Sequence, residues 1–351
     1  MNVRRHIFAA ALAATTALGL VTLSACSGTS SAGGDGDDGR LDVVASFYPM
    51  QYLAEQIGGD HVKVTTLTKP GVEPHDLELK PRQASELRQA DYILYLKGVQ
   101  PAVDEAIAQS GVEHTIDAAT LTKLENHGTD VGHDHGHEGG EHDGGHEGEE
   151  HEAGHEGEEH DGGHEGEEHA GEEHGAEAGG DPHIWLDPVK YAEVARGVGD
   201  SLAKADPARA ADYRKNTETL VGKLKALDAK FADGLRNSTT RTFITAHSAF
   251  GYLAERYGLD QHGIAGIGPE SEPSPARIKE LQTVAKQEKV STVFFETLAS
   301  DRTAKALAKD AGLRTDVLDP LEGITDRSKG EDYLAVMESN LAALQKALGS
   351  Q

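Results

Sequence analysis

The stretch PARAADYRKNTETLVGKLKALDAKFADGLR, residues 207–236, decides how the rest of the chain is organised. Asp206-Pro207 opens it with a typical helix start. Its apolar residues then recur at helical spacing, at Leu220, Leu224, Leu227, Phe231 and Leu235. An unbroken helix here spans roughly 45 Å at about 1.5 Å per residue, which is more than one small domain needs. The apolar stripe is too short for a coiled coil, so we expect a rigid linker helix between two lobes.

Strand-like and helix-like segments alternate on both sides of this stretch. Strands are expected at 41–46, 61–67, 92–96, 241–246, 291–295 and 314–318. One helix is expected to begin at Pro49, and another is expected to end near Ala90. Further helices are expected from Asp187-Pro188 to about Lys204, from Ser274-Pro275 onward, and over about 331–348. This alternation predicts the α/β class, as two (β/α) lobes with parallel sheets and a ligand in the cleft between them. The predicted boundaries are 41–204 for the N-terminal lobe, 205–237 for the linker helix and 238–351 for the C-terminal lobe.

The first 26 residues indicate where the protein works. Arg4-Arg5 precede an apolar run from Ile7 to Leu23, which is typical of a secretory signal peptide. A membrane anchor is the alternative, because about 17 residues is the lower limit for crossing a bilayer. The sequence Leu-Ser-Ala-Cys, ending at Cys26, resembles the bacterial lipobox, in which the cysteine receives a lipid. We therefore expect a signal peptide over 1–25, lipidation of Cys26 and an extracytoplasmic protein anchored to the outer face of the bacterial cytoplasmic membrane.

The region after the signal peptide fits export. Residues 26–40 are rich in Gly, Ser and Asp and predict a flexible tether. Cys26 is the only cysteine, so the exported body has no disulfides and its hydrophobic core must hold it together.

The acidic charge of the chain is concentrated in one insert. The chain has 60 Asp and Glu against 33 Lys and Arg, a net charge of −27, and residues 127–180 hold 19 of these acids and 12 of the 19 histidines. Such a charge argues against a nucleic-acid partner, because polyphosphate would be repelled. With 17 glycines and almost no large apolar residues, the insert is expected to be disordered without a ligand.

The insert carries a repeated metal-binding composition. The heptapeptide GHEGEEH occurs at 145–151, 154–160 and 163–169. Imidazole and carboxylate suit Zn²⁺ and other divalent cations, so we expect many weak sites, and the alternative is a solvated polyacidic linker. The predicted auxiliary, low-affinity metal ligands are His133, His135, His137, His142, His146, His151, His155, His160, His164, His169 and His174.

A tighter site is predicted outside the insert. His75 and His183 lie in loops punctuated by proline, and His247 directly follows a predicted strand. Asp319 and Glu296 also end predicted strands, and ligands of open α/β sheets bind beyond the carboxyl ends of strands. Three imidazoles and one carboxylate suit tetrahedral Zn²⁺ and suit Mn²⁺ less well. The predicted ligands are His75, His183, His247 and Asp319, with Glu296 as the rival for the fourth place and water as a third possibility.

The segments around these histidines resemble the metal-binding solute-binding lipoproteins of zinc and manganese ABC transporters. These segments are GVEPHD at 71–76, DPHIWLDP at 181–188, TAHSAFGY at 245–252 and EPSP at 272–275. The resemblance runs from about Leu41 to the C-terminus, interrupted by the insert. It implies two (β/α) lobes joined by one rigid helix, with a metal held between them by His75, His183, His247 and Asp319.

The resemblance also separates the branches of this family. Manganese members usually carry glutamate where this chain has His247, and zinc members commonly insert a His- and acid-rich loop before the second ligand, as here. One departure is LELKP at 77–81, where a proline more often follows the glutamate, which affects the shape of the loop rather than the ligands.

The resulting functional hypothesis is a monomeric binding protein, not an enzyme, that captures Zn²⁺ and delivers it to an ABC permease driven by an ATPase. A manganese-binding member of the same family is the first alternative. A secreted zinc hydrolase with Glu296 as general base is the second, although the chain lacks a nucleophile elbow and a phosphate loop, and its one His-Glu-x-x-His, HEAGH at 151–155, lies in the glycine-rich insert. A passive metal buffer or adhesin is the third. Capture by the insert should weaken in mild acid, because histidine titrates near pH 6.5 and binds metal when neutral.

Overall fold

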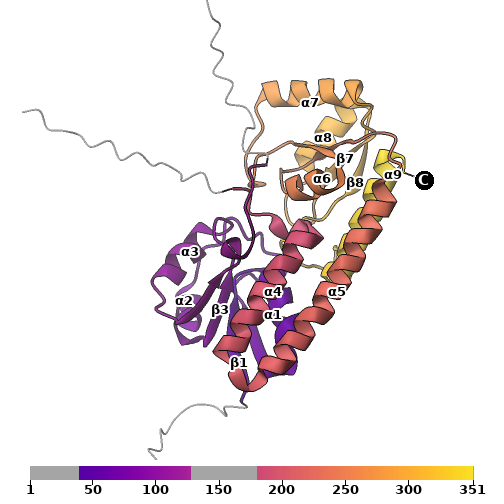
Figure 1. The fold of residues 1–351 in the computed structure, drawn as a ribbon. Helices are drawn as coiled ribbons and strands as arrows, with labels where there is room; N and C mark the ends of the chain where they lie inside the picture. Colours follow the sequence, from indigo (N-terminus) through magenta and orange to yellow (C-terminus); the bar gives the residue numbers. More distant parts are fainter. Residues whose placement is uncertain (1–38, 128–179, 351) are drawn as a thin grey trace, which may run out of the picture. The chain divides into compact units, whose positions relative to one another are not determined.

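The structure, a computed structural model, describes residues 39–127 and 180–350 (Figure 1). Four predicted features lie outside these residues and stay predictions: the signal peptide, lipidation of Cys26, most of the tether and the eleven auxiliary histidines of the insert. Within the described ranges, no helix combines the length and the apolar character that a membrane span requires.

The first lobe is built on a four-stranded parallel sheet. Its strands β1 (Leu41–Ala45), β2 (Val62–Thr66), β3 (Tyr92–Tyr95) and β4 (His114–Asp117) lie in the order β2-β1-β3-β4. Helices α1 (Tyr48–Gly58), α2 (Pro81–Gln89) and α3 (Pro101–Ala108) connect them, and α4 (Pro188–Ala205) follows the insert. All four helices have proline in the first turn, where its missing N–H has no helical partner to lose.

Helices cover both faces of this sheet. Successive side chains of a strand point to opposite faces, and β1 shows this directly. Val43 and Ala45 belong to the core shared with α1 and α4, whereas Val44 packs in a separate cluster with Leu87 of α2 and Val103 of α3. The sheet is therefore buried on both sides, as expected for parallel strands.

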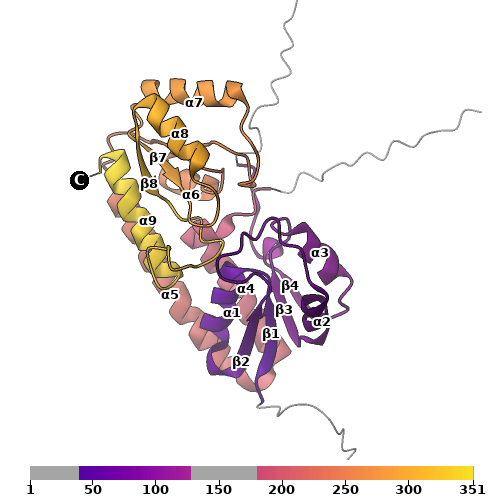
Figure 2. The same cartoon turned by 180° about the vertical axis from the view of Figure 1, so that it is seen from behind.

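The second lobe repeats the same strand order. Its strands β5 (Thr242–Thr245), β6 (Asp260–Gly263), β7 (Thr292–Phe295) and β8 (Arg314–Val317) form a parallel sheet in the order β6-β5-β7-β8. Its helices are α6 (Gly251–Tyr257), α7 (Pro275–Gln287), α8 (Arg302–Ala311) and α9 (Tyr333–Leu348). The view from behind shows the two sheets in separate groups of elements, with α5 and α9 along one side (Figure 2).

One long helix connects the lobes, as the sequence predicts. It is α5 (Ala210–Leu235), preceded by a 3-10 turn over Pro207–Arg209 rather than by a further turn of α-helix. Its 26 residues span about 39 Å and run beside both lobes in Figure 1. All the apolar residues of the predicted stripe are buried. In the first lobe α5 packs closely on α4, where an added Cβ on Gly199 would lie 2.1 Å from Thr217 Oγ1.

Candidate metal centre

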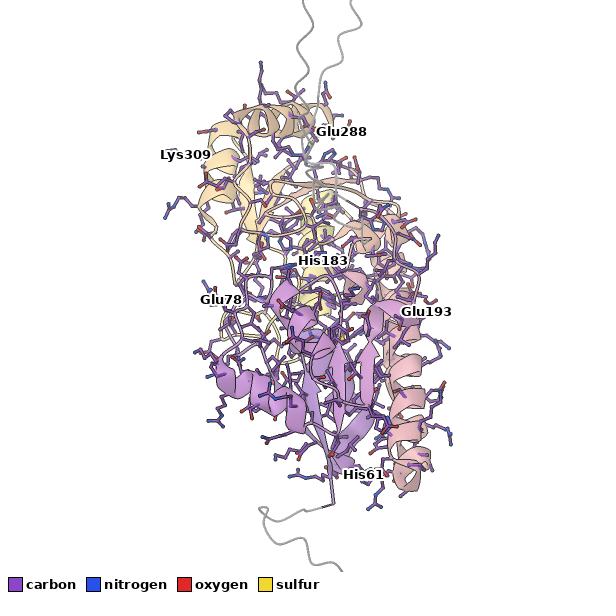
Figure 3. All side chains as sticks on the ribbon, turned by 90° about the vertical axis from the view of Figure 1, so that its left-hand side faces the viewer. His61, Glu78, His183, Glu193, Glu288 and Lys309 are labelled. Carbon is purple, nitrogen blue, oxygen red and sulfur yellow. The ribbon has the colours of Figure 1, made fainter. Side chains whose placement is uncertain are left out.

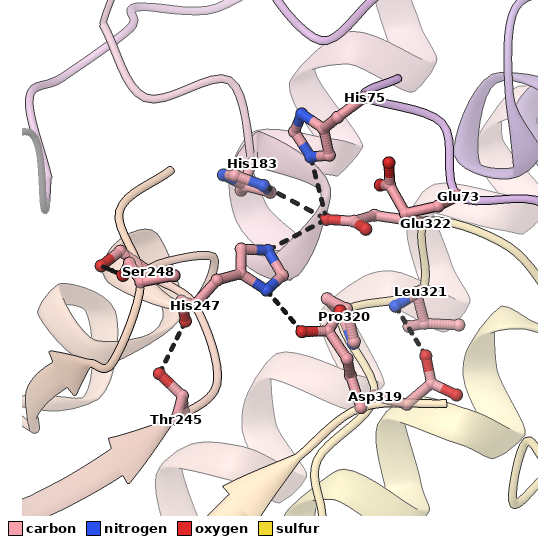
Figure 4. A network of polar contacts seen from close by, with 12 residues as sticks. Glu73, His75, His183, Thr245, His247, Ser248, Asp319, Pro320, Leu321 and Glu322 are labelled. Carbon is pink, nitrogen blue, oxygen red and sulfur yellow. Dashed lines mark hydrogen bonds and ion pairs between the residues drawn. The ribbon is translucent and has the colours of Figure 1, made fainter. Parts of the chain in front are cut away.

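Three imidazoles from distant parts of the chain converge on one carboxylate oxygen. His75 comes from the loop between β2 and α2, His183 from the segment before α4, and His247 from the end of β5. Their Nε2 atoms lie 3.3, 3.3 and 3.2 Å from Glu322 Oε1 (Figure 4). Figure 3, which labels His183, places it between the two lobes.

The geometry of this cluster fits a tetrahedral metal. Zn²⁺ with bonds of about 2.0–2.1 Å places its ligand atoms about 3.3 Å apart, and the three distances between nitrogen and oxygen match that value. His183 Nε2 and Glu322 Oε2 are buried and have no hydrogen-bond partner among the described residues. Buried polar atoms without partners are costly, and a bound cation would supply one. The four residues therefore fit Zn²⁺.

The cluster is almost closed to solvent. The side chains of His183 and Glu322 have no exposed surface and that of His247 is 1% exposed, while that of His75 is 12% exposed. Solvent therefore reaches the cluster most easily on the side of His75.

Two further carboxylates fix the orientation of two imidazoles. Asp181 Oδ1 lies 2.7 Å from His183 Nδ1, and Glu296 Oε1 lies 2.8 Å from His247 Nδ1. A carboxylate at Nδ1 holds the proton on that nitrogen and leaves the Nε2 lone pair facing the cluster. Glu296, the predicted rival ligand, therefore contacts the far side of His247 and not the centre of the cluster.

The structure places Asp319, the predicted fourth ligand, outside the group of His75, His183, His247 and Glu322. Asp319 is buried, but its carboxylate accepts hydrogen bonds from Leu321 N at 2.9 Å, Ser328 Oγ at 2.9 Å and Thr297 Oγ1 at 3.2 Å. Leu321 has a φ of 60°, in the left-handed region, and the bond from its N–H to Asp319 holds that conformation. Asp319 thus shapes the turn that carries Glu322, while Glu322 itself faces the imidazoles.

The chain offers one signal that could have found Glu322. It lies between Pro320 and Gly323, in a punctuated loop like those of His75 and His183. Asp319 is the first carboxylate after β8, and Glu322 follows it by three residues.

The charges of the cluster stabilise one another. Burial alone would raise the pKa of Glu322, but the charge of His247 and hydrogen bonds from the imidazoles hold it well below its usual range. Burial likewise works to lower the pKa of His247 and His183, but Glu296 and Glu322 hold the first well above its usual range, and Asp181 raises the second. The site therefore favours positive charge at its centre.

The His183 segment is fastened to the second lobe. Trp185 Nε1 donates to Pro320 O at 2.7 Å, and Tyr333 OH donates to Trp185 O at 2.6 Å. Tyr252 OH donates to Asp181 O at 2.7 Å. The predicted ligand His183, which precedes α4 in sequence, is therefore positioned by residues of the C-terminal lobe.

The remaining histidines of the described residues outside the insert lie away from this cluster. His61 Nε2 pairs with Asp212 at 3.0 Å, far along the first lobe in Figure 3, and His262 Nε2 pairs with Asp260 at 3.1 Å. His114 begins β4.

Comparisons with known proteins point to zinc-binding proteins. A family model described as the periplasmic component A of zinc-uptake complexes matches residues 43–347. The zinc-binding lipoprotein AdcA of Streptococcus pneumoniae is 34% identical over 316 residues, covering 88% of this chain but 56% of the relative's length. The high-affinity zinc uptake system protein ZnuA of Bacillus subtilis is 34% identical over 333 residues, covering 93% of each chain.

Solved structures give the same result. The Zn(II)-bound ZnuA-like domain of Streptococcus pneumoniae AdcA superposes with a TM-score of 0.65 at 30% identity, covering 88% of this chain and 99% of that domain. This chain therefore spans about half the length of the full streptococcal relative, over the part that corresponds to that domain.

Proposed function

The chain belongs to the family of periplasmic components of zinc-uptake complexes, and from that premise we propose that it captures extracytoplasmic Zn²⁺ and delivers it to a membrane permease. The convergence of three Nε2 atoms on Glu322 Oε1 at tetrahedral ligand spacing carries this proposal. The proposed ligands are His75, His183, His247 and Glu322.

The donor set favours zinc over manganese. Three imidazole nitrogens and one carboxylate match the tetrahedral preference of Zn²⁺, whereas Mn²⁺ favours more oxygen ligands. The names of the AdcA and ZnuA relatives, which refer to zinc, support this choice.

The same donor set argues for binding rather than catalysis. A catalytic zinc site keeps one position open for water or substrate, and a hydrolase also needs a general base directed at that water. Here Glu322 fills the fourth position, and Glu296, the base considered from the sequence, is engaged with His247 Nδ1. The family, named as a component of an uptake complex, agrees with a transport role.

The partners and location follow from the same premise. We propose an ABC permease with its ATPase as the recipient of the metal, a lipid on Cys26 as the membrane attachment, and a monomer as the working form. The relative named a lipoprotein and the periplasmic family description support the location. The insert is proposed to hold zinc loosely near the tight site.

Metal analysis after equilibrium dialysis tests the proposal. The wild type should retain one tightly bound zinc against a chelator and prefer it to Mn²⁺. His183→Ala should lose that zinc, because His183 is a central and fully buried donor. His61→Ala is the matched control, since His61 pairs with Asp212 away from the site. Tighter retention of Mn²⁺, or an unchanged zinc content in His183→Ala, would contradict the proposal.

A further inference from the structure

A second group of metal-competent side chains lies at the base of the insert. Glu125, His127 and Glu255 each offer one ligand atom, and these atoms all lie within 4.8 Å of one another. His127 Nε2 and Glu255 Oε2 are 2.9 Å apart. The Glu255 side chain is 60% exposed and that of Glu125 is 28% exposed, so both can adjust around an ion that arrives from solvent.

The imidazole of this group is held in place from behind. His127 packs edge-on against the ring of Tyr252, with ring centroids 4.5 Å apart. Gly251 makes room for it, because an added Cβ there would lie 2.2 Å from the Cβ of His127. The group therefore combines one fixed nitrogen donor with two movable carboxylates.

A buried carboxylate oxygen without a partner faces the same imidazole. Asp181 Oδ2 lies 3.3 Å from His127 Nδ1, and both atoms are buried without a hydrogen-bond partner among the described residues. The Asp181 side chain has no exposed surface, and its other oxygen contacts His183 Nδ1 at 2.7 Å. A ring that carries its proton on Nδ1 would satisfy Asp181 Oδ2 and leave Nε2 free to bind a cation.

The local charges match a divalent cation. Glu125, Glu255 and Asp181 supply three carboxylates, and within the described parts of the chain Lys190 is the lysine or arginine that ion-pairs with this group, 3.2 Å from Glu125 Oε1. Lys190 lies opposite Glu125 and His183 lies opposite Asp181, so the charge of Glu255 remains uncompensated when His127 is neutral. One nitrogen and two carboxylate oxygens, with water completing the shell, suit Zn²⁺ and similar borderline ions.

The group lies where the two ends of the insert meet. Of the described residues that flank the insert, His127 is the last one before it, and Asp181 is the second one after it. Asp181 N donates to Glu125 O at 2.7 Å, which closes the base of the insert. Asp181 therefore contacts His183 with one oxygen and faces His127 with the other.

We propose that Glu125, His127 and Glu255 form a second site for a divalent cation of the Zn²⁺ class, distinct from the four-residue cluster and adjoining it through Asp181. This inference rests on the proposed zinc-binding function and adds to it a defined second position on the folded body.

Anomalous diffraction at the zinc absorption edge tests the proposal on crystals of the full chain grown with several equivalents of Zn²⁺. We expect one peak among His75, His183, His247 and Glu322 and a second beside His127 Nε2. Glu255→Gln should remove the second peak and keep the first, and the protein should still fold because the Glu255 side chain is exposed. His127→Gln should do the same.

His262→Gln is the matched control. His262 pairs with Asp260, and no third metal-competent donor joins them among residues 39–127 and 180–350, so its replacement should leave both peaks in place. A first peak without a second in the wild type would overturn this inference and leave the proposed function standing. Persistence of the second peak in both His127→Gln and Glu255→Gln would also overturn it. Absence of the first peak would instead refute the zinc-binding function itself.

Discussion

Replacing Glu322 by glutamine removes one negative charge from the centre of the cluster and leaves the size of the side chain unchanged. The wild-type carboxylate oxygen faces three Nε2 atoms at 3.2–3.3 Å and has no contact with solvent. Breaking a buried charge pair costs about 3–5 kcal/mol. Each 1.4 kcal/mol is about tenfold in affinity, so Glu322→Gln should weaken zinc binding by about 10² to 10⁴-fold.

Two other carboxylates serve as controls of graded effect. Glu296→Gln should weaken binding by about 10–100-fold, the usual cost of losing a group that orients a ligating imidazole. Asp319→Asn should cost less than tenfold, because the amide oxygen can still accept the bond from Leu321 N. The predicted order of loss is therefore Glu322, then Glu296, then Asp319.

The single tryptophan gives an assay specific to this cluster. The ring centroid of Trp185 lies 5.1 Å from that of His183, so its emission should report occupancy of the cluster. Titration against a chelator of known zinc affinity gives the dissociation constant of each variant. Thermal unfolding of the zinc-free proteins checks that all of them fold. A Glu322→Gln protein that binds as tightly as the wild type, or a larger loss in Asp319→Asn, would refute the assignment of Glu322.

Three further predictions concern stability and protons. Gly222→Ala in α5 should stabilise the protein by about 0.5–1 kcal/mol, since a Cβ there meets open space. Gly199→Ala should destabilise the protein, because its Cβ would clash with Thr217. Urea unfolding of both variants measures these changes in the free energy of unfolding. Burial acts to lower the pKa of His183 and His247, but the neighbouring carboxylates raise it. Zinc affinity should therefore already fall as the pH drops toward about 6.5, with up to about two protons released per zinc bound. A zinc affinity that does not change with pH above about 6.5 would contradict this prediction. Free zinc at about a hundred times the dissociation constant should stabilise the folded protein by about 2.7 kcal/mol, so chelation of the zinc should lower the Tm.

The central strands and the linker helix could be predicted from the sequence because their apolar residues are buried. β1, β3, β5 and β7 occupy the middle of their sheets and carry clear apolar runs. The edge strands β4, HTID, and β6, DQHG, were missed because they are partly exposed and polar. Their pairing depends on the neighbouring strand rather than on their own pattern.

The histidines of the cluster could be predicted because each lies at a strand end or beside proline. Glu322 could not be located in the same way, because its position depends on long-range contacts. Asn340 of α9 donates to Asp319 O at 2.7 Å and accepts from Asp319 N at 2.9 Å, which sets the turn that carries Glu322. His127 also could not be placed from the sequence. The composition of residues 127–180 assigns it to the insert, but its packing against Tyr252 makes it part of the folded body.

The hydrogen bond between Trp185 and Pro320 bears on the order in which the proposed ligands should release the metal. It ties His183 to the turn of Glu322, and His247 lies on the same lobe, so these three donors form one rigid half of the cage. His75 alone comes from the opposite side, on an exposed loop that contains Gly71, and it is the donor nearest solvent. We therefore expect the bond to His75 to break first when the ion leaves and to form last when it enters, so the rate of exchange is set by that single loop.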